Sequence, residues 1–119
     1  MNIIIAGDVP MLASLLKMAI QDSGYDDISI AANQEDLLMM CFDAKPQVII
    51  IDLHIPETHC LRLIEQILDL DSKISVIVVA EAADNLGTKV LSAGARAYLE
   101  KPFSIFDIRE TIKKVKPIL

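Results

Sequence analysis

The sequence has few cysteines and none of the features of a secreted, disulfide-stapled protein. Cys41 and Cys60 are its only 2 cysteines, and they stand apart without a paired framework. The chain starts Met1-Asn2-Ile3 with no basic leader, so we expect a cytoplasmic protein whose thiols stay reduced. His54 and His59 form no recognised zinc spacing with these cysteines, so a soft-metal site is not expected.

Positive charge and long apolar runs are also scarce. The chain has 11 Lys and Arg against 17 Asp and Glu, a net charge of -6, which opposes direct binding to nucleic acid or anionic lipid. Its apolar stretches end well before the ~20 residues that a membrane-crossing helix needs. The acids that interrupt them are Asp8, Asp43, Asp52 and Glu81. We therefore expect protein partners, with no membrane or nucleic-acid contact.

The length and the hydrophobic pattern predict one domain, residues 1–119, that contains five strands. A chain of 119 residues can bury roughly 65% of its extended surface. Three runs are continuously aliphatic and β-branched, which is typical of strands covered on both faces, and two are weaker. The expected strands are Ile3 to Ala6, Ile28 to Ala31, Val48 to Ile51, Ile74 to Val79 and Ala95 to Leu99.

Helix signals fill the intervals between these strands. Pro10 suits the first turn of a helix, and Asn33 and Ser104 are typical N-caps. A third helix follows Pro56, and a fourth ends at Gly94. The last helix is amphipathic. Its expected core face consists of Ile105, Ile108, Ile112 and Val115.

Alternating strands and helices with short connections predict an α/β fold. We expect a doubly wound, flavodoxin-like five-stranded parallel sheet in the order 2-1-3-4-5, with helices on both faces. In such a sheet, ligands bind beyond the carboxyl ends of the strands, at the switch point between the first and third. Asp8 and Asp52 follow those two strands, and Lys101 follows the fifth. Two acids and one ammonium group should therefore share one rim.

Four sequence features in this order and spacing closely resemble the receiver domain of bacterial two-component response regulators. They are Asp8, Asp52 with Pro56 after it, Ala93-Gly94-Ala95 leading to Tyr98, and Lys101-Pro102-Phe103. The resemblance spans essentially the whole chain. It implies that Asp52 accepts a phosphoryl group from the phosphohistidine of a sensor histidine kinase. Lys101 would hold the acyl phosphate.

The resemblance also implies a cofactor and further partners. Asp8, Asp52 and the backbone carbonyl of His54 would hold Mg²⁺, as hard oxygen ligands do. The only catalysis expected is of the protein's own phosphorylation and dephosphorylation, and the signal would pass to a downstream protein. The face of the fourth helix, fifth strand and fifth helix, around Tyr98 and Phe106, is where relatives meet partners or form homodimers. Relatives also have a cis bond before the proline at position 102.

Three positions depart from the family pattern. Gly7 stands where relatives have the first of two acids, Val79 where they have Thr or Ser, and Cys60 where they have glycine. The missing acid should weaken Mg²⁺ binding, and the missing hydroxyl should reduce the bias toward the active state about tenfold or more. His54 and Glu81 occupy positions that tune dephosphorylation in relatives.

Other interpretations stay open at this level. The chain is either a working receiver or a degenerate pseudo-receiver that binds proteins without phosphorylation. A flavodoxin-like cofactor binder is disfavoured because no glycine-rich phosphate loop follows the first strand. Asp8 alone would also suit the role of a helix cap. The apolar run from Leu37 to Phe42 is either a partner surface or part of a broadly buried helix.

Overall fold

The computed structural model describes residues 1–115 and confirms the predicted α/β architecture. A parallel sheet has the strand order β2-β1-β3-β4-β5. The strands are β1 (Asn2–Gly7), β2 (Asp27–Ala31), β3 (Val48–Asp52), β4 (Ser75–Glu81) and β5 (Ala97–Lys101). The helices are α1 (Pro10–Asp22), α2 (Gln34–Ala44), α3 (Glu57–Leu70), α4 (Gly87–Ser92) and α5 (Ile105–Val115), with a short 3₁₀ turn η1 (Ala82–Asp84) after β4.

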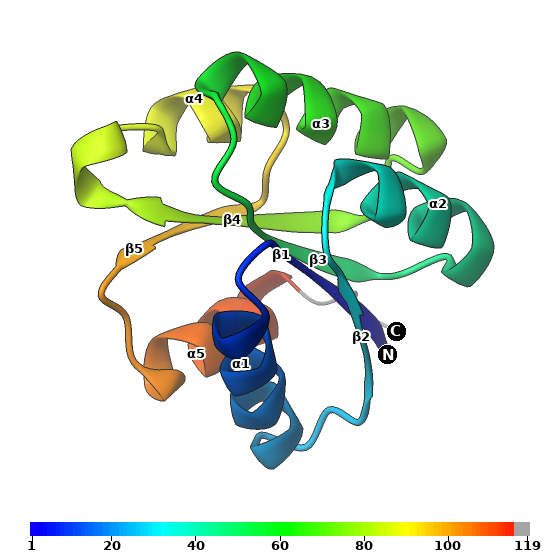
Figure 1. Cartoon of the computed structure of the whole chain (residues 1–119), viewed down its shortest axis with the longest axis vertical. Coiled ribbons are helices and arrows are strands. Elements are labelled where there is room, and N and C mark those ends of the chain that lie inside the picture. The colour runs from blue at the N-terminus through cyan, green and yellow to red at the C-terminus, as the bar shows by residue number, and fades with distance from the viewer. Residues whose placement is uncertain (116–119) are drawn as a thin grey trace.

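The helices form one layer on each face of the sheet (Figure 1). α1 and α5 lie below it in the view, and α2, α3 and α4 lie above it. Successive side chains of a strand point to opposite faces, so each central strand feeds both layers. Ile4 and Ile49 pack toward α2, α3 and α4, whereas Ile3, Ile5 and Ile50 pack toward α1 and α5. This double coverage explains why the central strands read as unbroken aliphatic runs.

Local signals place the helix starts as predicted. The Asn33 side chain accepts a hydrogen bond of 2.9 Å from the Asp36 amide, and Ser104 and Asp107 exchange two such bonds. Pro10 opens α1. The proposal that Asp8 caps this helix is wrong, because Val9 is the N-cap residue and makes no side-chain cap bond.

Two predictions about apolar residues need correction. Ile108, Ile112 and Val115 are buried as expected, but Ile105 is 55% exposed because it begins α5 and borders an open groove beside α1. In α2, Met39 and Phe42 are 66% and 73% exposed, which excludes a broadly buried helix. Within residues 1–115, none of the helices combines the length and the apolarity needed to traverse a lipid bilayer.

Candidate functional site

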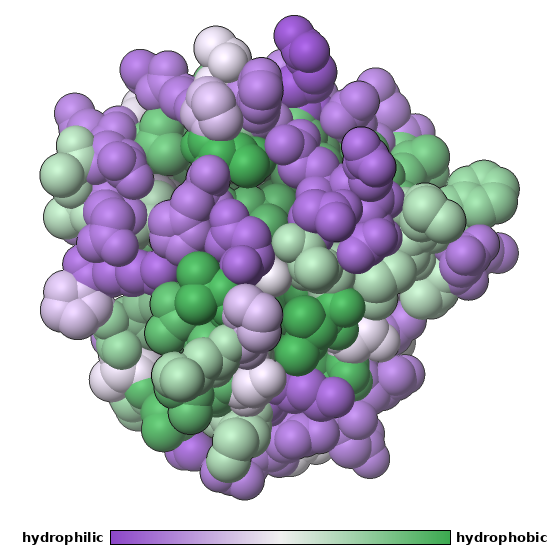
Figure 2. Space-filling view, viewed as in Figure 1, coloured by the Kyte–Doolittle hydropathy of each residue, from purple (hydrophilic) through white to green (hydrophobic). Residues whose placement is uncertain are grey.

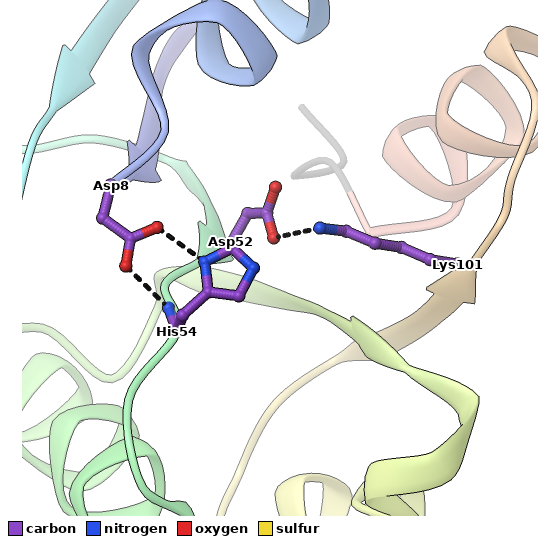
Figure 3. Close-up of polar contacts among 4 residues, drawn as sticks. All are labelled: Asp8, Asp52, His54 and Lys101. Atoms are coloured by element: carbon purple, nitrogen blue, oxygen red, sulfur yellow. Dashed lines mark hydrogen bonds and ion pairs between the residues drawn. The ribbon is translucent and has the colours of Figure 1, made fainter.

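Three strand ends bring the predicted site residues to one rim of the sheet (Figure 3). Asp52 is the last residue of β3 and lies opposite Gly7 in the pairing with β1, so the next residue of that chain segment, Asp8, emerges beside it. Lys101 is the last residue of β5 and pairs with Glu81 of β4. The parallel topology alone therefore collects residues that are far apart in sequence.

Asp52 and Lys101 form an ion pair. Lys101 Nζ lies 3.0 Å from Asp52 Oδ1, and the two side chains are 21% and 15% exposed. Partial removal from water strengthens such a contact relative to a surface pair. The Lys101-Pro102 peptide bond is cis, as the family resemblance implied. The ammonium group is thus placed against the acid that we expect to be the nucleophile.

Asp8 is held by His54 in a contact that the sequence did not reveal. The His54 amide donates to Asp8 Oδ2 at 2.9 Å, and His54 Nδ1 lies 2.7 Å from Asp8 Oδ1. A carboxylate only accepts, so Nδ1 carries the proton. Burial by itself raises the pKa of Asp8, but the hydrogen bonds from the His54 ring and amide and the charge of His54 outweigh it and lower the pKa from 3.8.

Gly7 leaves room for a close approach of α1 to the first strand. A Cβ atom at position 7 would lie 3.0 Å from the Cβ atom of Ala13 on α1. This distance is tighter than nine in ten real Cβ contacts, so a side chain at position 7 requires Ala13 to move by a few tenths of an ångström. The absence of an acid at position 7 and the close packing of α1 against β1 therefore depend on each other.

Val79 lies beside the ion pair, and Tyr98 lies on β5 opposite Val78. Val79 is 4% exposed and borders the same small cavity as Asp52 and Lys101, where it offers no hydroxyl group. The Tyr98 hydroxyl is buried and lies near the backbone of Leu86. Its ring lies over Gly87, where a Cβ atom would come within 3.1 Å of Tyr98 Cδ1. The ring is thus packed inward without a hydroxyl at position 79.

An apolar groove of about 390 Å³ adjoins the ion pair. It runs between α1 and α5, and its lining includes both Asp52 and Lys101. Figure 2 shows hydrophobic residues gathered in this lower part of the molecule. On α1, the exposed apolar side chains are Met11, Leu12, Leu15 and Met18. The site therefore opens toward a surface suited to another protein.

The donor set suits a hard cation. Within residues 1–115, no group of three or more His, Cys, Asp or Glu side chains could hold a metal ion through side chains alone. The predicted Mg²⁺ set uses two carboxylates, Asp8 and Asp52, and a backbone carbonyl, that of His54. These are oxygen ligands of the kind Mg²⁺ prefers. The residues present fit this ion in type.

Comparison with known proteins identifies the family. The model of the response regulator receiver domain matches residues 3–113. This chain belongs to that family. Receiver domains accept phosphate on an aspartate and generally bind Mg²⁺ at an acidic site, and response regulators interact with histidine kinases and downstream targets.

Individual relatives agree with this assignment. The chain is 25% identical to the chemotaxis protein CheY of Thermotoga maritima over 96% of both proteins. It is 26% identical to the transcriptional regulatory protein PdtaR of Mycobacterium tuberculosis over 94% of this chain but 55% of that protein. A CheY-like receiver domain from Methanospirillum hungatei superposes with a TM-score of 0.81 at 26% identity, over 95% of this chain and 90% of that one.

Proposed function

We propose that this receiver domain accepts a phosphoryl group on Asp52 from the phosphohistidine of a sensor histidine kinase. A carboxylate oxygen of Asp52 attacks the phosphorus, the P–N bond breaks, and the kinase imidazole leaves. Lys101 offsets the negative charge on the transferred group, as phosphoryl transfer requires. The observation that carries the proposal is the 3.0 Å pair of Asp52 and Lys101 at the rim, next to Asp8.

Asp8, Asp52 and the carbonyl of His54 would hold the Mg²⁺ ion. When bound, the ion neutralises charge on the phosphoryl oxygens. Asp8 contributes a carboxylate at the end of β1, and Asp52 contributes both the nucleophile and a ligand. With Gly7 beside it, Asp8 provides the only acid of the usual pair, so the ion is expected to bind more weakly than in relatives that have both.

Two surfaces support protein partners. The apolar groove that reaches Asp52 and Lys101 fits a helix of the phosphoryl donor. The face of α4, β5 and α5 carries Phe106, which is 64% exposed, and is our proposed site for a downstream protein or a homodimer. The net charge of -6 argues against direct nucleic-acid binding. Free, buried Cys41 and Cys60 support a reducing cytoplasmic setting.

A second candidate function is a pseudo-receiver that binds proteins without phosphorylation. Val79 favours it, because this residue lacks the hydroxyl that would contact the phosphoryl group. Tyr98 favours it too, because its hydroxyl is already buried without phosphorylation. In this role the same face would be presented permanently to the partner. Phosphorylation chemistry distinguishes the two functions.

The test is incubation of the protein with acetyl phosphate and Mg²⁺, followed by intact mass measurement. We expect one added phosphoryl mass, its loss in Asp52→Asn, and its retention in the control Asp69→Asn, which changes an exposed acid on α3. Persistence of the mass in Asp52→Asn contradicts the assignment. No added mass, together with an amide spectrum unchanged by beryllofluoride, favours the pseudo-receiver.

A further inference from the structure

His54 occupies both oxygens of the Asp8 carboxylate. Its amide holds Oδ2 at 2.9 Å, and its ring holds Oδ1 at 2.7 Å (Figure 3). The other acid at the rim, Asp52, is engaged by Lys101. Both carboxylates that would hold a cation therefore already make contacts with groups of the same chain.

We propose that His54 is a positioning residue that competes with the divalent cation for Asp8. This inference rests on the proposed role of Asp8 as a metal ligand. The imidazole N–H, 2.7 Å from Oδ1, draws on the electron pairs of that oxygen that a cation would also use, so the ring and the cation compete for it. The free energy of cation binding is reduced by the free energy of the contact that is broken.

Gly7 makes this competition complete. A receiver with two acids after the first strand has a second carboxylate that can meet the cation while the first is held. Here only Asp8 stands at the end of β1, and an acid at position 7 would crowd Ala13 at a Cβ–Cβ distance of 3.0 Å. A cation that uses this side of the site therefore binds the same carboxylate that His54 holds.

The exposure of His54 lets the ring leave without disturbing the core. Its side chain is 53% exposed, against 33% for Asp8. The backbone N–H bond to Oδ2 stays in place when the ring turns away, so Asp8 keeps its orientation. His54 thus sets the cation concentration at which the site fills and leaves the position of the acid unchanged.

The test is a Mg²⁺ titration of the protein in the absence of any phosphoryl donor. Binding is measured by calorimetry and by changes in the amide spectra. His54→Phe keeps a ring but removes its nitrogen, and we expect it to bind Mg²⁺ about tenfold more tightly, as expected for loss of a competing hydrogen bond to a charged group. His54→Gln retains a side-chain donor and should restore weaker binding. His59→Phe changes the other, exposed histidine and should match the wild type. In the wild type, Mg²⁺ should shift the ring resonances of His54 but not those of His59.

Equal or weaker Mg²⁺ binding by His54→Phe overturns the competition. Thermal unfolding of each variant verifies that it is folded, since both histidines are exposed. Phosphorylation of Asp52 is measured separately on the same samples. If His54→Phe binds more tightly but Asp52 takes no phosphate, the competition stands and the proposed function fails. If Asp52 is phosphorylated and the Mg²⁺ affinities are equal, the competition fails and the proposed function stands.

Discussion

The two halves of the rim differ in how they are built. On one side, Asp52 and Lys101 are 15% and 21% exposed and form a direct ion pair that follows the family pattern. On the other, Asp8 and His54 are 33% and 53% exposed, and the neighbouring acid is replaced by Gly7. The half that would carry the nucleophile is shielded and keeps both charged groups, with its departure at Val79 behind them, whereas the half that would hold the cation is open and lacks one acid. Departures from the family pattern at the rim itself therefore concern cation binding first.

Removal of the amine should have the largest effect on the nucleophile half. Lys101→Met is expected to slow phosphorylation of Asp52 by about 10²–10³-fold, the usual loss for one group that stabilises developing charge. The measurement is the rate of phosphoryl mass gain with acetyl phosphate. Lys89→Met is the matched control, because Lys89 makes an exposed 2.9 Å pair with Glu57 away from the site. Equal phosphorylation rates in Lys101→Met and Lys89→Met would show that Lys101 takes no part in phosphoryl transfer.

Restoring the missing acid should bring the cation half closer to the family pattern. Gly7→Asp alone is expected to lower the free energy of unfolding by about 1–3 kcal/mol, because its side chain crowds Ala13. Combination with Ala13→Gly should relieve the crowding and recover this free energy of unfolding, except for about 1 kcal/mol that a glycine within a helix costs. Urea unfolding measures both variants. If Gly7→Asp costs no stability, close packing of α1 does not explain the glycine.

The double variant also tests the cation site. It should bind Mg²⁺ more tightly than the wild type, because a second carboxylate adds Coulomb attraction. Ala13→Gly without the acid is the control and should leave the affinity unchanged. An unchanged affinity in the double variant would place the cation elsewhere.

A hydroxyl at position 79 should make the nucleophile half more effective as a switch. Val79→Thr is expected to increase the bias of the phosphorylated protein toward its active conformation roughly tenfold, through one hydrogen bond to a charged oxygen. Amide spectra with and without beryllofluoride report the populations. Val76→Thr is the matched control, since Val76 is buried on the same strand but does not border the small cavity beside Asp52 and Lys101. A gain in both variants, or in neither, would contradict the assignment of position 79.

The smallest expected effect is on acid stability in metal-free buffer. The pKa of Asp8 is lower in the folded protein than its ordinary value of 3.8, with His54 as the cause. The resulting stabilisation is fully present above the unfolded value and is lost as the pH falls through the lower folded pKa. His54→Phe should therefore show a shallower loss of unfolding free energy in acid, and His59→Phe should not. Parallel curves for the wild type and His54→Phe would deny the contact in solution.

The fold and the nucleophile half could be predicted from sequence because they depend on robust patterns. Continuous aliphatic runs mark strands covered on both faces, and a parallel sheet gathers whatever follows those strands, so Asp8, Asp52 and Lys101 had to emerge at one rim. No such rule places a flexible loop side chain. The bond from the His54 ring to Asp8 depends on the side-chain torsions of both residues, and the Gly7–Ala13 contact depends on the position of α1 to within an ångström.

Apolar periodicity predicts a helix but does not say which apolar residues are covered. Ile105 follows the pattern of α5 and is nevertheless exposed, because it lies at the start of the helix. Met39 and Phe42 lie on α2 beyond the reach of its neighbours. Coverage depends on where each helix ends relative to the sheet, and that is a tertiary property.

Gly87 determines how closely the Tyr98 ring can pack against the start of α4. The Tyr98 ring rests where any larger residue at position 87 would press on it, since a Cβ atom there would lie 3.1 Å from Tyr98 Cδ1. A small change at the start of α4 would therefore tip an aromatic ring on the edge strand outward. A substitution at position 87 can therefore change the shape of the surface at β5 without changing the side chains that a partner protein would contact.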